Sequence, residues 1–241
     1  RRPALHLKSS RMRHGCFLNE ICLFEDFNLK IEDGQFVSVV GSNGSGKTSM
    51  LNIICGSIPV DAGKILVNGV DISRQKDYIR HRRIGRVFQD PSKGTCPSMT
   101  ILENLAIADN KGKAYGLGRG TNHARMDAYR ELLASVGLGL EDKMHTKVGA
   151  LSGGQRQTLA LLMATMKPIE FLILDEHTAA LDPKTAEIVM QLTGKIVKEK
   201  KVTTIMVTHN LRYAVEYGDR LLMMHQGHAI IDKSGAEKQA M

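Results

Sequence analysis

The segment that most constrains the fold of this chain is the octapeptide Gly41-Ser42-Asn43-Gly44-Ser45-Gly46-Lys47-Thr48. It fits the pattern G-x-x-x-x-G-K-[ST], in which glycines let backbone N–H groups approach phosphate oxygens without a Cβ in the way. The apolar residues 36–40 predict a strand before this glycine loop, and residues 49–55 predict a helix after it. This order predicts a phosphate-binding site, because the free N–H groups and the dipole of a helix start favour an anion.

The glycine loop also assigns chemistry to its residues. Lys47 is expected to reach the β- and γ-phosphates of a nucleoside triphosphate, and the Thr48 hydroxyl is expected to ligate Mg²⁺. The candidate nucleotide contacts are Gly41, Ser42, Asn43, Gly44, Ser45, Gly46, Lys47, Thr48 and Ser49. A simple glycine turn is the alternative, and the predicted strand and helix on either side argue against it.

The composition is that of a folded protein. The chain has 241 residues, of which 42% are apolar and 24% charged, so it fits one large α/β domain or a core with a smaller lobe. The net charge of +8 fits ordinary surface charge plus an anion site, with nucleic-acid binding or proximity to an anionic membrane as alternatives. The four cysteines form no C-x-x-C pair and are expected to be reduced thiols. Without a long apolar run or a secretory signal, the expectation is a soluble, cytoplasmic chain.

Strand and helix patterns divide the chain into a core and an insertion. Residues 1–91 and 166–241 are rich in strand patterns and predict an α/β core, whereas residues 92–165 predict a helical lobe inserted into it. Thr100 followed by Glu103 predicts a capping box at a helix start. Two strand patterns that flank Gly227 predict a terminal hairpin.

A pair of carboxylates follows one of the predicted core strands. Residues 171–174 are Phe-Leu-Ile-Leu, which is typical of a buried parallel strand, and Asp175 and Glu176 come directly after them. Beside the glycine loop, Asp175 could hold the hydration shell of Mg²⁺, and Glu176 could orient and polarise an attacking water. The alternative, a surface acidic pair at a strand end, is disfavoured by the presence of the glycine loop.

A second phosphate-type pattern lies far along the chain, at Leu151-Ser152-Gly153-Gly154-Gln155. Ser152 can cap the helix that follows, and the two glycines leave the helix start open to an anion. The alternative is an ordinary capped helix. Because one nucleotide has one γ-phosphate, two such sites in a chain need an explanation.

Together these motifs resemble those of the nucleotide-binding subunits of ABC transporters, over nearly the whole chain. The resemblance implies an α/β fold: a P-loop NTPase core with a mostly parallel sheet, flanking helices and an N-terminal antiparallel β part, and an inserted helical subdomain. It implies that residues 151–155 are the signature and that residues 180–182 are the D-loop at a dimer interface. It also implies that Gln89 senses Mg²⁺ and the attacking water, and that His209 contacts the γ-phosphate.

The resemblance further implies partners and a location. The nucleotide of one subunit would lie between its own glycine loop and the partner's Ser152, Gly153, Gly154 and Gln155, so the working unit is a dimer with a second copy or a related ATPase subunit. ATP and Mg²⁺ are the implied cofactors. Transmembrane permease subunits are the implied partners, together with an extracellular substrate-binding protein, and no nucleic acid is expected. The chain would then sit peripherally on the cytoplasmic side of the cell membrane.

One expected residue of the family is missing from its usual place. The family carries an upstream aromatic residue that stacks on adenine, and Phe17 is the nearest aromatic here. His14 and Met12 are the alternatives at that position. The preference for ATP is therefore inferred from the family and not from a base-stacking residue.

The motifs favour one function over several others. The expected function is ATP hydrolysis that powers import of a small solute such as an amino acid, since some similar ATPases serve amino-acid-type uptake systems. Export of lipoproteins or peptides is the alternative. An ATPase acting on DNA would need a long coiled coil before the signature, and one acting on ribosomes would need two cassettes. A GTPase is excluded because residues 110–113 lack the acidic residue of N-K-x-D.

Overall fold

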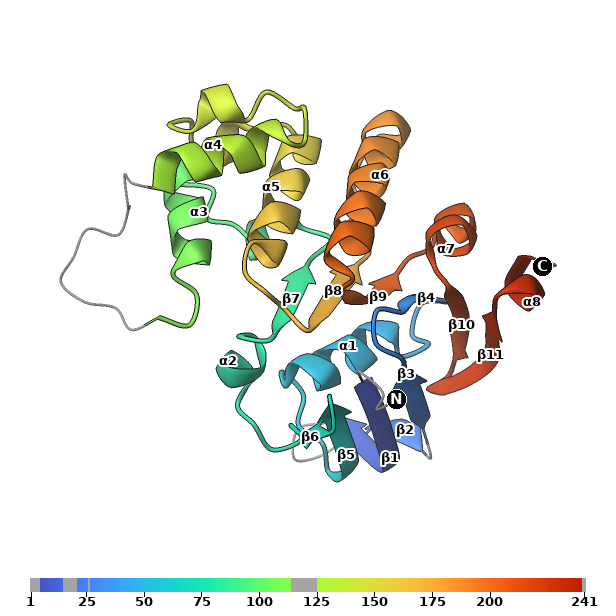
Figure 1. Cartoon of the computed structure of the whole chain (residues 1–241). Helices are drawn as coiled ribbons and strands as arrows, with labels where there is room; N and C mark the ends of the chain where they lie inside the picture. The colour runs from blue at the N-terminus through green and yellow to red at the C-terminus, as the bar shows by residue number, and fades with distance from the viewer. Residues whose placement is uncertain (1–4, 15–20, 26, 114–124, 240–241) are drawn as a thin grey trace.

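The computed structural model describes residues 5–14, 21–25, 27–113 and 125–239, and the strands among them form two sheets (Figure 1). The five-stranded sheet contains β1 (Leu5–His14), β2 (Ile21–Glu25), β3 (Asn28–Ile31), β5 (Ala62–Val67) and β6 (Val70–Asp71). The six-stranded sheet contains β4 (Phe36–Gly41), β7 (Ile84–Val87), β8 (Phe171–Asp175), β9 (Thr203–Val207), β10 (Arg220–His225) and β11 (His228–Ser234).

The six-stranded sheet is the predicted α/β core sheet. Its order is β11-β10-β4-β9-β8-β7, and every neighbouring pair is parallel except the terminal hairpin β10-β11. The hairpin around Gly227 is therefore confirmed. The five-stranded sheet is antiparallel, as expected for the N-terminal part. The long strand β1 was not predicted. Its apolar-polar alternation is limited to Leu5 and Leu7, and the basic residues that follow do not continue a strand pattern.

Alternating side chains of the core strands reach two separate hydrophobic clusters. In β8, Phe171 and Ile173 face the cluster shared with the antiparallel sheet, while Leu172 and Leu174 face the cluster shared with the larger helices. β9 follows the same rule, with Ile205 and Met206 on opposite faces. Both faces are thus covered, which explains why these strands read as continuous apolar runs.

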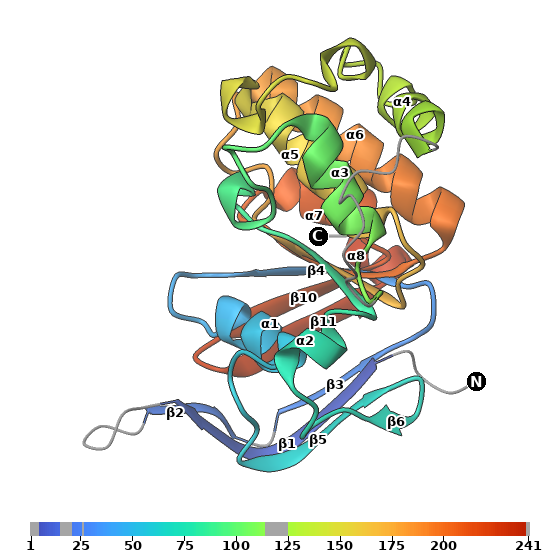
Figure 2. The ribbon, with the colours of Figure 1, turned by 90° about the vertical axis from the view of Figure 1, so that its left-hand side faces the viewer.

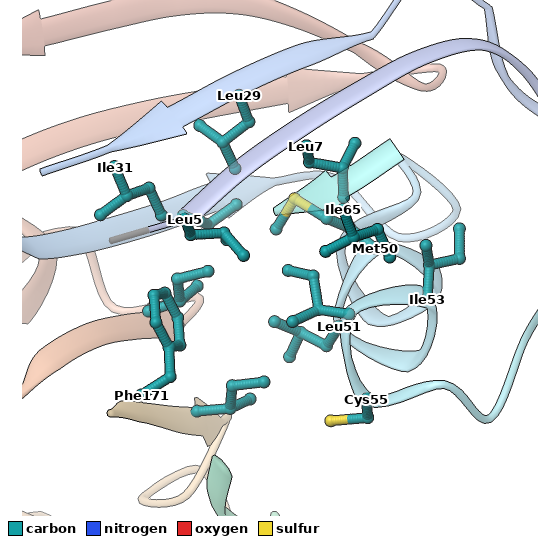
Figure 3. Packing of buried hydrophobic residues seen from close by; sticks show 14 of the residues in the cluster. Leu5, Leu7, Leu29, Ile31, Met50, Leu51, Ile53, Cys55, Ile65 and Phe171 are labelled. Atoms are coloured by element: carbon teal, nitrogen blue, oxygen red, sulfur yellow. The ribbon is translucent and has the colours of Figure 1, made fainter. Parts of the chain in front are cut away.

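Helix α1 (Lys47–Cys55), which directly follows the glycine loop, lies between the two sheets (Figure 2). Its Met50, Leu51 and Ile53 are buried against side chains of β1, β3, β5 and β8 (Figure 3). Burying several large aliphatic side chains contributes about 1.5–3 kcal/mol each. The helix whose start would bind phosphate is therefore held in place by hydrophobic side chains of both sheets.

The C-terminal end of α1 is held by a buried arginine. Arg80 ends the short helix α2 (Asp77–Arg80) and donates to the carbonyl oxygens of Ile53 (2.8 Å) and Ile54 (3.2 Å). It also donates to the carbonyls of Ser73 and Gln75. A cation at this end of α1 satisfies the last free carbonyls and complements the helix dipole.

The other face of the six-stranded sheet is covered by the longer helices (Figure 2). The helices on this side are α3 (Ile101–Asp109), α5 (Gly153–Thr165), α6 (Pro183–Lys200) and α7 (Leu211–Tyr217), and α4 (Met126–Ala134) packs on α3 farther from the sheet. The short α8 (Ala236–Gln239) ends the described chain. Single 3₁₀ turns occur at η1 (Pro91–Lys93), η3 (Glu141–Lys143) and η4 (Val148–Ala150). Helices α3, α4 and α5 lie together away from the antiparallel sheet (Figure 1).

Several helix starts in the structure have side-chain caps, including the predicted one at Thr100. Thr100 and Glu103 form the capping box of α3, with the Glu103 carboxylate 2.7 Å from the Thr100 backbone nitrogen. Asp182 caps α6 by accepting from the Thr185 N–H at 3.1 Å, and Pro183 occupies the first helical position. Each cap is worth about 1 kcal/mol, so these sequence signals are strong enough to set where a helix begins.

Candidate nucleotide-binding site

The glycine loop joins β4 to α1, as predicted. Gly46 is the N-cap of α1 and has a φ of 99°, a conformation that favours glycine. Gly41 has no room for a side chain, because a Cβ there would clash with the carbonyl oxygen of Met224 in β10. The loop is tied to the neighbouring hairpin by a hydrogen bond from Gly227 N–H to the Ser45 carbonyl (3.1 Å). Gly44 also has a positive φ, of 78°, so all three loop glycines are favoured by the backbone itself.

Lys47 lies at the first position of α1 and is only 5% exposed. Its ammonium donates to the carbonyls of Gly41 (2.8 Å) and Ser42 (2.9 Å), and it lies 3.4 Å from the Ser45 hydroxyl. Burial lowers the pKa of Lys47, while the negative charges of Glu176 and Asp175 oppose that shift. The loop therefore carries a fixed positive group at the place where phosphate charge is expected.

A pocket of about 520 Å³ opens over the loop. It is lined by Asn43, Gly44, Ser45, Gly46, Lys47, Thr48, Ser49, Glu176, Gln226 and Gly227. The predicted loop residues therefore gather with the predicted catalytic glutamate. The β10–β11 turn at Gln226 and Gly227 was not predicted to line the site, and the tight-turn pattern in the sequence could not indicate that it folds back onto the loop.

Strand register brings the carboxylate pair to the same edge of the sheet. Asp175 lies opposite Val207 of β9, and Val207 lies opposite Val39 of β4. Because the strands are parallel, the segments that follow them emerge side by side. Glu176 and His209 are therefore placed beside the glycine loop by strands that are remote in sequence.

Glu176 and His209 contact each other directly. His209 Nε2 lies 2.8 Å from Glu176 Oε1, and their side chains are 47% and 18% exposed. Glu176 has a φ of 50°, which is uncommon for a residue with a side chain, and its N–H donates to the Val207 carbonyl (2.9 Å). Sequence reasoning placed both residues near a γ-phosphate but did not foresee this contact.

A second pocket of about 430 Å³ adjoins the first at Glu176. Among its lining residues are Thr48, Gln89 and Asp175, which are the three predicted metal-binding residues. It is also lined by Arg86 of β7, which sequence reasoning missed. Arg86 donates to Asp175 Oδ2 at 2.7 Å.

The predicted signature forms a helix start that lines neither of these pockets. Ser152 is the N-cap of α5, and its side chain and that of Gln155 form a reciprocal capping box with two contacts of 3.3 Å. Gly153 lines a third pocket of about 350 Å³, together with Gln89 and Leu181. Residues 152–155 do not line either pocket of the glycine loop. Within one chain the glycine loop and the signature therefore line different pockets, although the second and third pockets share Gln89 and Asp90.

Gly154 has a packing role that the sequence did not indicate. A Cβ on Gly154 would collide with the methyl group of Thr185 in the first turn of α6. The starts of α5 and α6 thus touch at this glycine. The close approach of the two helices favours glycine here, whether or not an anion also binds at this helix start.

Phe17, the predicted base-stacking residue, lies outside the described residues. The alternatives Met12 and His14 belong to β1, where they are opposite Phe24 and Ile21 of β2.

His177, which follows Glu176, is a buried histidine. Its Nε2 lies 3.1 Å from the Thr193 hydroxyl, and that hydroxyl donates to the Val189 carbonyl at 2.7 Å. Thr193 therefore accepts from an Nε2–H, and because burial disfavours the charged ring, His177 is the neutral Nε2–H tautomer. Burial lowers the pKa of His177 from 6.5 to about 4.

This histidine predicts a pH-dependent stability. Between pH 6.5 and about pH 4 the unfolded chain binds a proton at His177 that the folded chain excludes, so stability falls as the pH falls through this range. In urea unfolding at pH 7.5 and pH 4.5, we expect the stability advantage of wild type over His177→Gln to shrink by about 2–3 kcal/mol at the lower pH. The exposed His145→Gln is the matched control and should show no such change. An advantage of wild type over His177→Gln that does not change with pH would contradict the prediction.

The donor set near Asp175 suits Mg²⁺. A hydroxyl, a carboxylate and an amide oxygen are hard oxygen ligands, and Mg²⁺ is usually held by one or two carboxylates with phosphate oxygens and water. Within the described ranges, no group of three or more His, Cys, Asp and Glu side chains could hold a metal ion. A magnesium site of the expected kind needs no such group.

A glycine loop and a carboxylate pair at one edge of a parallel sheet define a P-loop nucleoside triphosphatase. A family model described as ABC transporter matches residues 24–179, and the chain belongs to that family. It is an ATP-binding subunit of an ABC transporter, an ATPase with the expected cassette fold. In the described part of the chain, no helix has the length and apolar character needed to cross a bilayer.

Individual relatives support this assignment. The tyrosine transport ATP-binding protein of Clostridioides difficile (strain R20291) is 49% identical over 217 residues, which cover 90% of this chain and 86% of that protein. The phosphonates import ATP-binding protein PhnC of Lactococcus lactis subsp. cremoris (strain SK11) is 32% identical over 220 residues, covering 88% and 87% of the two chains. The dimeric ATP-binding cassette MJ0796, solved in a post-hydrolysis state with ADP and phosphate, has a TM-score of 0.80 at 30% identity and covers 95% of this chain and 98% of its own.

Proposed function

We propose that this chain powers the import of a small solute, with tyrosine or a related aromatic amino acid as the first candidate. The observation that carries the proposal is the separation of the signature from the glycine loop within one chain, which calls for a second subunit. The substrate class is supported by the 49% identity to a tyrosine transport ATP-binding protein. Relatives named for phosphonate and polyamine import support the direction of transport.

Each site residue has a proposed role. Residues 41–49 hold the phosphates through backbone N–H groups, and Lys47 neutralises the β- and γ-phosphate charge. Glu176 accepts a proton from the attacking water, and His209, which lies 2.8 Å from it, orients that carboxylate and contacts the γ-phosphate. Thr48, Asp175 and Gln89 would hold Mg²⁺, which supplies positive charge against the phosphates when bound.

The proposed working unit is a head-to-tail dimer. Ser152, Gly153, Gly154 and Gln155 of one subunit would close over the nucleotide held by the other. The α5 helix start suits this role because its N–H groups and dipole face an approaching anion. Loss of the γ-phosphate after hydrolysis removes the group that both subunits contact, so the dimer opens. The dimeric cassette at 30% identity supports this pairing.

The proposed partners are membrane permease subunits, with the chain attached peripherally on the cytoplasmic side. An extracellular binding protein would deliver the solute, and nucleic acid has no part in the cycle. The segment from Gln89 to η1 would transmit the opening and closing of the dimer to the permease. Its first residue, Gln89, lines the second pocket, and η1 leads on to α3.

The test is purification of the tagged chain from native membranes, followed by reconstitution into proteoliposomes. We expect a multi-span permease to accompany the chain, and ATP-dependent uptake of labelled tyrosine that unlabelled phenylalanine reduces and spermidine does not. The Lys47→Met chain should give no uptake. Recovery of ribosomes or nucleic acid in place of a permease would overturn the transport function, and uptake of other solutes without aromatic amino acids would overturn the substrate class.

A further inference from the structure

Arg86 is a buried cation beside the proposed magnesium site. It lies in β7 opposite Ile173 of β8, and since side chains alternate along a strand, it faces the same side of the sheet as Ile173 and Asp175. That side packs on α1. The Arg86 side chain is 7% exposed and the Asp175 side chain is 13% exposed, so both charges are largely removed from water.

Three groups fix the Arg86 guanidinium. One terminal nitrogen donates to Asp175 Oδ2 at 2.7 Å, and the other donates to Asn52 Oδ1 at 2.8 Å. The guanidinium carbon lies 4.6 Å from the centre of the Phe88 ring. The planar guanidinium is held by hydrogen bonds at both terminal nitrogens and by the ring on one face, so its side chain has little conformational freedom. It therefore fixes the position of the Asp175 carboxylate.

Asn52 connects this arrangement to the glycine loop. It lies four residues after Thr48 on α1, which places both side chains on one face of the helix. Both also line the second pocket. Arg86 thus bridges the helix that carries the metal-binding hydroxyl and the strand that carries the metal-binding carboxylate.

We propose that Arg86 is a positioning residue for the magnesium site: it holds Asp175 by Oδ2 and leaves Oδ1 to the hydration shell of Mg²⁺. This inference rests on the proposed role of Asp175 in holding the metal. Outer partners of metal-binding carboxylates fix ligand orientation, and their loss typically weakens metal affinity about 10- to 100-fold. The ammonium of a lysine cannot bridge Asn52 and Asp175 in the same way, so Arg86→Lys should lie between wild type and Arg86→Met.

The test measures binding of a fluorescent ATP analogue over a range of free Mg²⁺ concentrations. We expect Arg86→Met to need about 10- to 100-fold more Mg²⁺ for half-maximal metal-dependent binding. Binding in EDTA, which does not involve the metal, should stay close to the wild-type value. Asn52→Ala should shift the Mg²⁺ requirement in the same direction by a smaller factor, because the guanidinium keeps its bond to Asp175.

Arg83→Met is the matched control. Arg83 directly precedes β7 and pairs with Glu170 at 2.6 Å, away from both pockets, so its loss should leave the Mg²⁺ requirement unchanged. Thermal unfolding checks that each variant is folded, and Asn52→Ala and Arg86→Lys carry the test if Arg86→Met does not fold. A purely structural role would lower the melting temperature without changing the Mg²⁺ requirement.

The outcomes separate this inference from the proposed function. If Asp175→Asn raises the Mg²⁺ requirement and folded Arg86 variants do not, the metal site stands and the role of Arg86 is overturned. A lower Mg²⁺ requirement in Arg86→Met would also overturn it, because Arg86 would then compete with the metal. If Asp175→Asn leaves the requirement unchanged, the proposed metal role of Asp175 fails and the inference fails with it.

Discussion

Replacing Glu176 by glutamine is expected to lower the rate of ATP hydrolysis by about 10²- to 10⁴-fold while ATP still binds. An amide of nearly the same shape cannot accept a proton from water, whereas the phosphate contacts of residues 41–49 do not involve this side chain. Steady-state phosphate release and equilibrium binding of ATP measure the two effects separately. The exposed Glu199→Gln should hydrolyse ATP like wild type.

The same variant should also change the association state. Because the γ-phosphate that both subunits contact is no longer removed, Glu176→Gln is expected to accumulate as a dimer when ATP is present and to remain a monomer without it. Light scattering after size-exclusion chromatography distinguishes the two states. Wild-type hydrolysis by Glu176→Gln would show that another group acts as the base.

Replacing Lys47 by methionine is expected to remove nucleotide function at an earlier step. Methionine keeps an unbranched, buried side chain but lacks the ammonium, so the β- and γ-phosphates lose a buried positive partner. Loss of one such charged donor lowers turnover by about 10²- to 10³-fold, and the ATP affinity should fall as well. ATP titration by calorimetry and a turnover assay measure both quantities.

The exposed Lys195→Met provides the control for the loss of one positive charge. Circular dichroism should show that Lys47→Met is folded, because the carbonyls of Gly41 and Ser42 that it contacts can be satisfied by water. A Lys47→Met chain with wild-type affinity and turnover would contradict the proposed phosphate contact. The two variants together separate binding from chemistry, since only Glu176→Gln should form an ATP-dependent dimer.

Features decided by neighbouring residues could be predicted from the sequence. The capping boxes at Thr100 and Ser152 and the start of α6 at Asp182 follow from side chains that reach backbone groups three residues away. The glycine loop follows from φ preferences and from the strand and helix around it. In such cases the short pattern contains both interacting groups.

Features decided by strand register could not be predicted in this way. The bond from Arg86 to Asp175, the contact of His209 with Glu176 and the approach of Gly227 to Ser45 each join segments from different strands. A sequence pattern within one segment contains only one of the two residues that form each contact. The packing of Gly154 on Thr185 is missed for the same reason, since the glycine alone gives no indication of what approaches it.

The contact between Gly154 and Thr185 has a consequence for how two bound nucleotides could influence each other. In a head-to-tail pair, the start of α5 would contact the nucleotide held by the partner. The start of α6 is connected to the subunit's own site, because Asp182, which accepts from the Thr185 N–H, is joined by a short segment to Glu176. Because Gly154 has no side chain, the starts of α5 and α6 are in direct contact. In such a pair, movement imposed on the start of α5 by one nucleotide would be passed to α6 and toward the glutamate of the other site, which would couple the two hydrolysis events.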